Sequence, residues 1–245
     1  MNLSGASQAF VVFDNQDSGC LSYGVESGGH RWFVKTAVEE SAAGSLQRGA
    51  ALHAAVTHPN IVRPVDTIRE GGRTPTLVYP WIDGTVLNHA TNDGSDRSGL
   101  ERFQQVPVAE VEGALSAVLD AHLAIVTAGF VAVDLYDGCF LYDFDHSKVW
   151  LIDLDEYRPG PFTLEQDRLP GSERYMAPEE WVRGSTIDER TTVFVLGRTL
   201  HHLLDSKRGW RGRESQSRVI DRATAPDPGE RYQEVGSLVA AWLTS

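Results

Sequence analysis

The chain has 245 residues, of which 41% are hydrophobic and 23% are charged. This length suits one large domain, or two lobes that share a cleft, and the composition suits a folded core better than a disordered chain. Acidic residues number 34 against 22 lysines and arginines, which gives a net charge of −12. A chain this acidic is a poor match for nucleic acid or an anionic membrane surface, so we expect neither as its main partner.

The sequence has no run of about 18 apolar residues, the length that a membrane-spanning helix needs. Residues 1–8 lack the basic start and the long apolar stretch of a secretory signal. The two cysteines, Cys20 and Cys139, are too few for a disulfide framework or a zinc ligand set. These observations predict a cytoplasmic protein.

The first third of the chain predicts β-strands and one helix. Apolar or β-branched runs separated by turn residues predict strands over residues 9–13, 20–25, 31–37, 61–68 and 76–79. A segment rich in alanine and leucine, residues 42–56, predicts a helix that His58-Pro59 ends.

The remainder of the chain is mostly helical in its pattern. Residues 92–99 are polar and rich in glycine, serine and aspartate, which predicts a loop. Further elements are a short hairpin joining 140–142 to 148–152, and helices over 108–126, 187–204, 217–223 and 235–243. The simplest architecture is a small β-rich part and a larger helical part that meet near residues 79–84.

Three acidic residues, Asp134, Asp153 and Asp155, stand where short apolar runs stop. Carboxylates that converge at strand ends are suited to holding Mg²⁺ or to accepting a proton. Lys35 lies in an otherwise apolar strand, where it needs an anionic partner such as a phosphate, or must reach water. Taken singly, these residues are equally compatible with turn aspartates and a lysine whose charged end reaches solvent.

Taken together and in chain order, these segments resemble the protein-kinase superfamily, over roughly residues 9–243. The resemblance rests on the order of the motifs more than on any single one. The matching motifs are Phe33-Val34-Lys35, His58-Pro59-Asn60-Ile61-Val62, the hinge-like segment 77–84, Asp134, Asp153-Leu154-Asp155, the segment 171–179 that ends in Ala177-Pro178-Glu179, the segment 187–197 and Asp227-Pro228-Gly229-Glu230-Arg231-Tyr232.

The resemblance implies an α+β, bilobal fold of protein-kinase type. Residues 1–82 would form the N-terminal lobe, a five-stranded sheet plus one helix. Residues 83–245 would form a mostly helical C-terminal lobe with the catalytic loop and the activation segment. The chain looks most like bacterial Ser/Thr kinases of actinobacterial type reduced to the kinase domain, with degenerate glycine-rich and catalytic loops.

The resemblance also implies roles in phosphoryl transfer from ATP, which depends on positioning and charge neutralisation. Asp134 would orient the attacking hydroxyl or accept its proton. Asp153 would bind the Mg²⁺ or Mn²⁺ that bridges the ATP phosphates, and Lys35 would contact the α- and β-phosphates. A structural ion pair beneath the activation segment would join Glu179 to Arg231.

Four further positions are implied for the nucleotide. Gly19 and Leu21 would lie at the end of the glycine-rich loop. The backbones of Pro80 and Ile82 would meet adenine at the hinge between the lobes.

The sequence departs from the family pattern near the nucleotide. Asp14 and Gln16 stand where the first two glycines of the glycine-rich loop belong, and side chains there hinder the approach of the backbone to phosphate. The usual acid of the N-lobe helix falls on Gly49. Lys35 therefore needs another partner, and three candidates stay open: Glu39, Glu40 and Asp155.

The catalytic loop departs as well. Ala132 and Val133 replace a histidine and an arginine, and Thr192 replaces the aspartate that braces the loop. Tyr136 stands for the loop lysine, and Cys139 for the asparagine that binds a second metal, although a thiol is a poor ligand for a hard cation. Two nearby carboxylates are the alternative metal ligands: Asp137 and Asp155.

Three functions are compatible with this pattern. The first is an ATP-dependent phosphotransferase of the Ser/Thr protein-kinase class, favoured because Asp134 and Asp153 are present. The second is a weak or inactive pseudokinase that acts as a binding or scaffold module, favoured by the altered loops. The third is a small-molecule kinase, favoured by Tyr136 and disfavoured by Ala177-Pro178-Glu179.

Overall fold

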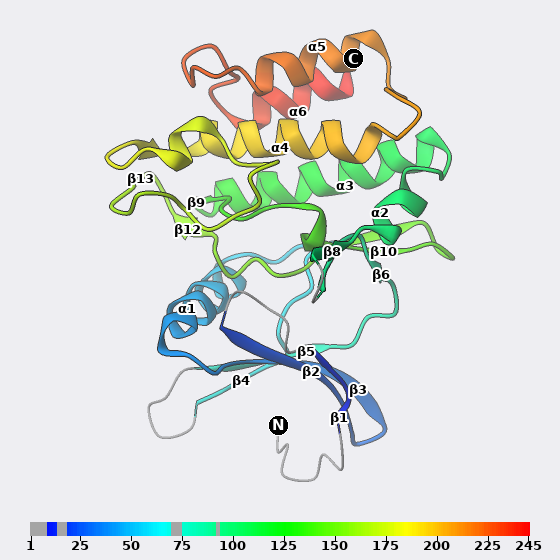
Figure 1. The fold of residues 1–245 in the computed structure, drawn as a ribbon, viewed down its shortest axis with the longest axis vertical. Coiled ribbons are helices and arrows are strands. Elements are labelled where there is room, and N and C mark those ends of the chain that lie inside the picture. The colour runs from blue at the N-terminus through cyan, green and yellow to red at the C-terminus, as the bar shows by residue number, and fades with distance from the viewer. Residues whose placement is uncertain (1–8, 14–18, 70–74, 92–93) are drawn as a thin grey trace.

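The computed structural model describes residues 9–13, 19–69, 75–91 and 94–245. These residues form two lobes, one with a twisted β-sheet and a single helix, the other with a stack of helices (Figure 1). This architecture confirms the predicted α+β, bilobal, protein-kinase-like fold.

A five-stranded antiparallel sheet forms the N-terminal lobe, in the order β1-β2-β3-β5-β4. Its strands are β1 (Ala9–Phe13), β2 (Cys20–Ser27), β3 (His30–Ala37), β4 (Asp66–Ile68) and β5 (Thr76–Pro80). Lys35 pairs with Ser22 and Leu77, and Phe33 pairs with Tyr79. Because cross-strand partners share a face and side chains alternate along a strand, all five residues face the same side of the sheet.

Helix α1 (Glu40–Ala55) packs on that face. Its buried positions recur every three or four residues and so form one side of the helix: 42, 45, 46, 49, 52 and 53. Near its start, Ala42 and Leu46 pack with Leu77 and Tyr79 of β5, whereas Leu52 near its end packs with the core of the C-terminal lobe. The helix therefore contacts both lobes.

The segment after α1 is hydrogen-bonded to the C-terminal lobe. The Leu151 N–H donates to the Asn60 carbonyl at 2.7 Å, and the Val62 N–H donates to the Leu151 carbonyl at 3.0 Å. The Asn60 side chain also donates to the Val149 carbonyl at 2.8 Å. These bonds fix the end of α1 relative to the C-terminal lobe.

The C-terminal lobe is built on α3 (Val108–Thr127) and α4 (Glu189–Leu204), with further helices stacked beyond them (Figure 1). Those helices are α5 (Glu214–Ala223) and α6 (Val235–Leu243), and the short α2 (Ser98–Phe103) lies near the lobe boundary. Helix α4 is buried over most of its surface because it contacts α3, α5 and α6. Asp188 caps its start by accepting a hydrogen bond from the Arg190 N–H.

Short strand pairs organise the loops of this lobe. The pairs join β10 (Phe140–Asp143) to both β6 (Thr85–Val86) and β11 (Lys148–Leu151), β7 (His89–Thr91) to β8 (Gly94–Asp96), β9 (Phe130–Val131) to β12 (Arg158–Pro159), and β13 (Phe162–Thr163) to β14 (Thr186–Ile187). Single 3₁₀ turns cover Asp137–Cys139 and Pro178–Trp181. Asp134 follows β9 and Asp153 follows β11, so paired backbone positions both aspartates.

Several predicted boundaries are wrong. The predicted strand 61–68 is reduced to β4, because Ile61 forms only an isolated bridge with Leu151 and Pro64 has no N–H to donate. The predicted loop 92–99 contains β8 and the start of α2, while residues 92 and 93 lie outside the described residues. The helix predicted from 187 begins at Glu189, and the helix predicted from 217 begins at Glu214. Local pattern does not reveal the distant strand that each segment pairs with.

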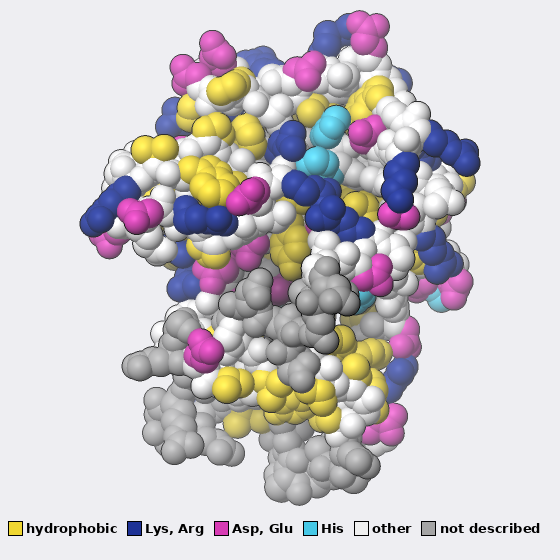
Figure 2. All heavy atoms as spheres, viewed as in Figure 1, with side chains coloured by type: hydrophobic (Ala, Val, Ile, Leu, Met, Phe, Trp, Pro, Cys, Tyr) yellow, Lys and Arg dark blue, Asp and Glu magenta, His cyan; other side chains and the backbone are white. Residues whose placement is uncertain are grey.

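No helix in the described part of the chain combines the length and the apolar character needed to cross a membrane. Side chains of both charges are interspersed over the visible face of the C-terminal lobe (Figure 2). The excess of acidic residues is therefore not gathered into one patch on that face.

Gly197→Ala tests how closely α4 packs on α5. A β-carbon at Gly197 would lie 2.8 Å from both Ala223 Cβ and Thr224 Cγ2. Overpacking of this kind costs roughly 1–3 kcal/mol, so we expect urea unfolding to show a loss of that size. Gly113→Ala in α3 is the matched control, because no atom lies within 4 Å of its added β-carbon. The control should stabilise by up to about 1 kcal/mol, and equal losses in both variants would contradict this packing.

Candidate active site

The Lys35 ammonium lies between two carboxylates from one segment of the chain. Its Nζ is 2.5 Å from Asp153 Oδ1 and 2.6 Å from Asp155 Oδ2. The side chains of Lys35 and Asp155 are only 7% and 5% exposed, whereas that of Asp153 is 43% exposed. We call Lys35, Asp153 and Asp155 the lysine cluster. Asp153 is therefore the member of this cluster that can meet a ligand from solvent.

The charges in the lysine cluster support one another. Burial by itself would lower the pKa of Lys35, but attraction to Asp153 and Asp155 outweighs burial and raises that pKa well above its ordinary value. Burial raises the pKa of Asp155, and the charge of Lys35 opposes this rise. With both acids ionised, the cluster carries one net negative charge, which suits a bound cation.

Gly49 of α1 faces Asp155 at the position where the family resemblance expects an acid. A β-carbon on Gly49 would lie 2.0 Å from Asp155 Oδ1 and 3.0 Å from Asp155 Cγ. Asp155, one of the three candidate partners that the sequence leaves open for Lys35, forms an ion pair with Lys35. The side chain of Glu40 lies outside the described residues.

The next residue, Glu156, ties the same segment to α1. Its two carboxylate oxygens lie 2.7 and 2.6 Å from Arg48 Nη2, and it also accepts a hydrogen bond from the Ser45 hydroxyl. Sequence analysis missed this contact, although Ser45, Arg48 and Gly49 fall on one helical face. That spacing was the available signal.

Asp134 and Asp153 both adopt a left-handed backbone conformation, with φ of 60° and 57°. Non-glycine residues in this region cost of order 1 kcal/mol and gather at functional sites, where the surrounding structure enforces them. Burial and, next, the charge of Asp153 raise the pKa of Asp134 to about 7. The two aspartates are therefore electrostatically coupled.

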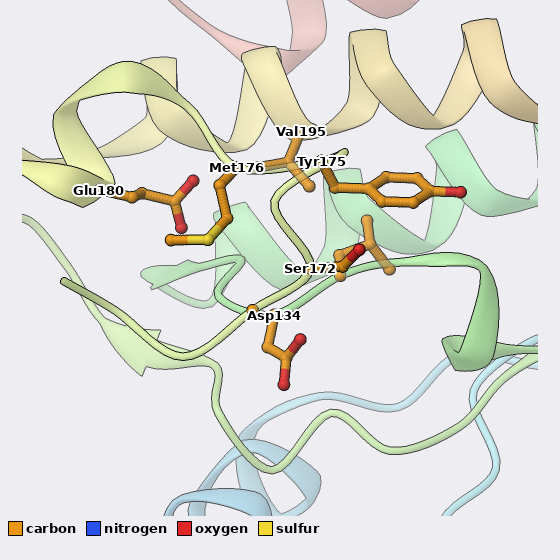
Figure 3. A pocket seen from close by; sticks show the side chains of 8 residues that line it. Asp134, Ser172, Tyr175, Met176, Glu180 and Val195 are labelled. Atoms are coloured by element: carbon orange, nitrogen blue, oxygen red, sulfur yellow. The ribbon is translucent and has the colours of Figure 1, made fainter. Parts of the chain in front are cut away.

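Asp134 lines a small pocket with residues of the activation segment and α4 (Figure 3). Ser172, Tyr175 and Met176 lie on one side of it, and the Asp134 carboxylate points away from α4. The activation segment thus lies next to the residue expected to handle the hydroxyl proton.

The loop before Asp134 is braced by a hydroxyl rather than by a carboxylate. The Ala132 N–H donates to Thr192 Oγ1 at 3.0 Å, and Thr192 is fully buried. The Cys139 thiol donates to the Asp134 carbonyl at 3.3 Å. The altered residues of this loop therefore still hold the backbone at Asp134.

Asp137 is fully buried and already engaged by neighbouring side chains. It accepts hydrogen bonds from Asn88 Nδ2 at 2.8 Å and from Arg174 Nη1 at 3.2 Å. Burial raises the pKa of the Cys139 thiol, which keeps that thiol neutral. These contacts favour a structural role for both residues.

The positions expected to contact the nucleotide lie at the end of β5 and at the start of β2. Pro80 ends β5, and Ile82 packs against the cluster that contains Leu77 and Tyr79. Gly19 has φ of 66° just before β2. Asp14 and Gln16, which define the altered glycine-rich loop, lie outside the described residues.

The register of β2 separates Leu21 from Lys35. Leu21 pairs with Thr36, whereas Ser22 pairs with Lys35, so Leu21 lies on the opposite face of the sheet. Phe33, named in the sequence only as part of the lysine motif and not as a site residue, shares the face of Lys35. Its ring centroid lies 6.1 Å from that of Tyr79, and the two-residue spacing from Lys35 was the signal for it.

Glu179 and Arg231 form a bidentate ion pair beneath the activation segment. The Nη1–Oε1 and Nη2–Oε2 distances are 2.7 and 2.9 Å, and the Arg231 side chain is fully buried. Arg231 also donates to the carbonyls of Ala225, Pro226 and Arg190. The pair joins the activation segment to the chain that leads into α6.

The chemistry of these donors fits one divalent cation together with a polyphosphate. Carboxylate oxygen is the ligand that Mg²⁺ prefers, and Asp153 supplies it at the exposed side of the lysine cluster. The described residues form no group of three or more side chains that could hold a metal. A cation here would therefore share its coordination with phosphate oxygens and water, as Mg²⁺ commonly does. The buried thiol of Cys139 does not fit a second hard cation.

Comparison with known proteins also points to a protein-kinase-like chain. No family model matches the sequence. The Serine/threonine-protein kinase PknD of Chlamydia caviae and that of Chlamydia abortus are each 24% identical to this chain over 237 residues. Each alignment covers 79% of this chain and 25% of the relative, so the chain spans about a quarter of the length of these relatives. This distant similarity, together with the bilobal fold, supports a kinase-like function.

Arg231→Leu should strongly destabilise the fold. Removing one member of a buried ion pair leaves the other charge unpaired and costs roughly 3–5 kcal/mol, measurable by urea unfolding. Arg218→Leu is the control, because Arg218 pairs with Glu214 on the surface, where the two side chains are 65% and 86% exposed. The control should change stability by about 0.5 kcal/mol or less, and similar effects of both variants would contradict the assignment.

Glu180 should make stability depend on pH. Burial raises the pKa of Glu180 to about 8, above its ordinary value of 4.5. Between these values the folded state keeps a proton that the unfolded chain has released, so the free energy of unfolding falls as pH rises. In Glu180→Gln the melting temperature should fall less between pH 6 and pH 8.5 than in wild type. The exposed Glu173→Gln should behave as wild type, and an unchanged slope in Glu180→Gln would refute the buried proton.

Proposed function

We propose that the protein is an ATP-dependent phosphotransferase of the Ser/Thr protein-kinase class, which transfers the γ-phosphate of MgATP to a hydroxyl group. The observation that carries the proposal is the lysine cluster, in which Lys35 lies within 2.6 Å of two acids from the other lobe. Asp134, coupled to Asp153, completes the arrangement. The proposal places the nucleotide between residues 1–82 and residues 83–245.

In this proposal Lys35 binds the α- and β-phosphates, and its raised pKa keeps it charged throughout the physiological pH range. Asp153 holds the cation through its exposed carboxylate. When bound, Mg²⁺ or Mn²⁺ neutralises phosphate charge as the bond to the leaving group weakens. Holding the donor in this way is most of what phosphoryl transfer requires of a protein.

Asp134 accepts or orients the proton of the attacking hydroxyl. A pKa of about 7 leaves a large share of the carboxyl groups ionised at neutral pH and gives them useful basicity. At the other end of the nucleotide, the Pro80 carbonyl and the Ile82 N–H meet adenine, and Gly19 lies at the phosphate side. The proposal assigns the cleft-facing position on β2 to Ser22 rather than Leu21, because Ser22 is the cross-strand partner of Lys35.

A pseudokinase is the second candidate, and one observation favours it. Asp137 is held by Asn88 and Arg174, and Cys139 stands where the family carries a metal-binding asparagine. A chain of this kind would keep a nucleotide site or a binding surface without turnover. A small-molecule kinase is the third candidate, and the experiment that follows separates it from the other two.

The deciding experiment measures intact-protein mass after incubation with ATP and Mg²⁺ or Mn²⁺, for wild type and Asp134→Asn. We expect added phosphate on the wild type alone, because the variant loses the group that handles the hydroxyl proton. Asp145→Asn, in the exposed turn between β10 and β11, is the matched control and should be labelled like the wild type.

Two other results would point elsewhere. ATP consumption that requires an added small hydroxyl compound, without protein labelling, would replace the proposal with a small-molecule kinase. A wild type that binds MgATP, while Lys35→Met does not, could still show no turnover with or without an added small hydroxyl compound. That result would replace the proposal with a pseudokinase.

A further inference from the structure

The geometry points to a relocated carboxylate: Asp155 acts as the positioning residue for Lys35, in place of an acid on α1, and Gly49 is the complementary space on the helix. The inference rests on the proposed function in one respect, since it assigns Lys35 to phosphate. Its consequence is that the partner of Lys35 and the cation-holding Asp153 belong to one short segment.

Gly49 and Asp155 fit together sterically. Any side chain at position 49 would begin 2.0 Å from Asp155 Oδ1, closer than two nonbonded atoms can approach. The conflict is with the carboxylate itself, because the same β-carbon would lie at an ordinary contact distance, 3.4 Å, from Asp155 Cα. Glycine inside a helix costs about 1 kcal/mol relative to alanine, so its presence in this alanine-rich helix needs a reason. The Asp155 carboxylate provides that reason.

Asp155 is less accessible than a metal ligand at this site needs to be. Asp153 and Asp155 are two residues apart and both contact Lys35, but their exposures are 43% and 5%. The buried Asp155 carboxylate lies between the ammonium group of Lys35 and the backbone of α1 at Gly49. The Asp153 carboxylate accepts a hydrogen bond from Lys35 through Oδ1, and its exposure leaves the other oxygen available to a cation. The two acids therefore divide the roles of orienting the lysine and holding the metal.

Helix α1 is also attached to the segment that carries Asp155. Glu156 binds Arg48 and Ser45, which lie one and four residues before Gly49 on the same helix. Consecutive acids thus attach the segment to β3 through Asp155 and to α1 through Glu156. Rotation of α1 is not needed to deliver a carboxylate to Lys35, because the carboxylate already comes from the segment that carries Asp153.

A charge-exchange experiment tests the inference with four proteins: wild type, Asp155→Gly, Gly49→Glu and the double variant. Two quantities are measured for each, the free energy of unfolding without ligand and the affinity for a fluorescent ATP analogue with Mg²⁺. Each single variant should lose both stability and affinity, the first by removing the partner of Lys35, the second by crowding Asp155. In the double variant the acid returns to the helix, so both quantities should recover.

The expected loss of affinity follows from the direct contact between position 49 and Asp155. Residues in direct contact couple strongly, so each single variant should bind the analogue roughly tenfold more weakly and the double variant should recover most of that loss. Gly49→Ala should weaken binding as well, by displacing Asp155. Gly44→Ala on the same helix is its matched control, because the added β-carbon meets only the flexible end of Arg48, at 3.2 Å.

Three results would overturn the inference. A double variant no better than the worse single variant, in both quantities, would show that the acid on α1 cannot replace Asp155. A variant Asp155→Gly that mainly raises the Mg²⁺ concentration needed for binding would make Asp155 a metal ligand. Gly49→Ala that behaves as Gly44→Ala would remove the steric argument. If the wild type binds no nucleotide, the proposed function fails, but recovery of stability in the double variant still decides this inference.

Discussion

The arrangement of the two lobes depends on one buried ammonium group. Lys35 extends from the central part of the sheet to two carboxylates that follow β11, and the pair with Asp155 is almost fully shielded from water. A lysine buried without these acids would be strongly destabilising, so the sheet and the C-terminal lobe are held in one relation. Helix α1 completes the contact, since Gly49 leaves the space and Arg48 holds the next acid.

The loops that carry Asp134 and Asp153 are organised by backbone conformation and packing. Thr192 braces the loop at Ala132, and the Cys139 thiol donates a hydrogen bond to the carbonyl of Asp134. Asp134 and Asp153 both keep a left-handed backbone conformation. Beneath the activation segment, the buried pair of Glu179 and Arg231 acts as a second anchor. Much of what the polar motifs of a kinase provide is therefore provided here by other contacts, which is why departures from the motifs coexist with an ordered site.

Much of this was predictable from the sequence. The order of the motifs predicts the bilobal fold, because strand, turn and helix signals recur in an arrangement that few folds share. Lys35 was identifiable because an ammonium group stands in an otherwise apolar strand, and Asp134 and Asp153 because each stands where a short apolar run stops. The assignment of Leu21 depended on strand register, and a shift of one residue moves a side chain to the other face.

By itself, the sequence determined that Lys35, inside an apolar strand, needs an anionic partner or must reach water. It did not determine which acid, because Glu39, Glu40 and Asp155 were all acceptable by local pattern. Only the tertiary structure decided, by bringing a glycine on α1 against the chain that follows β11. The choice among these acids depends on the room between two packed elements, and that room does not exist until the lobes have assembled.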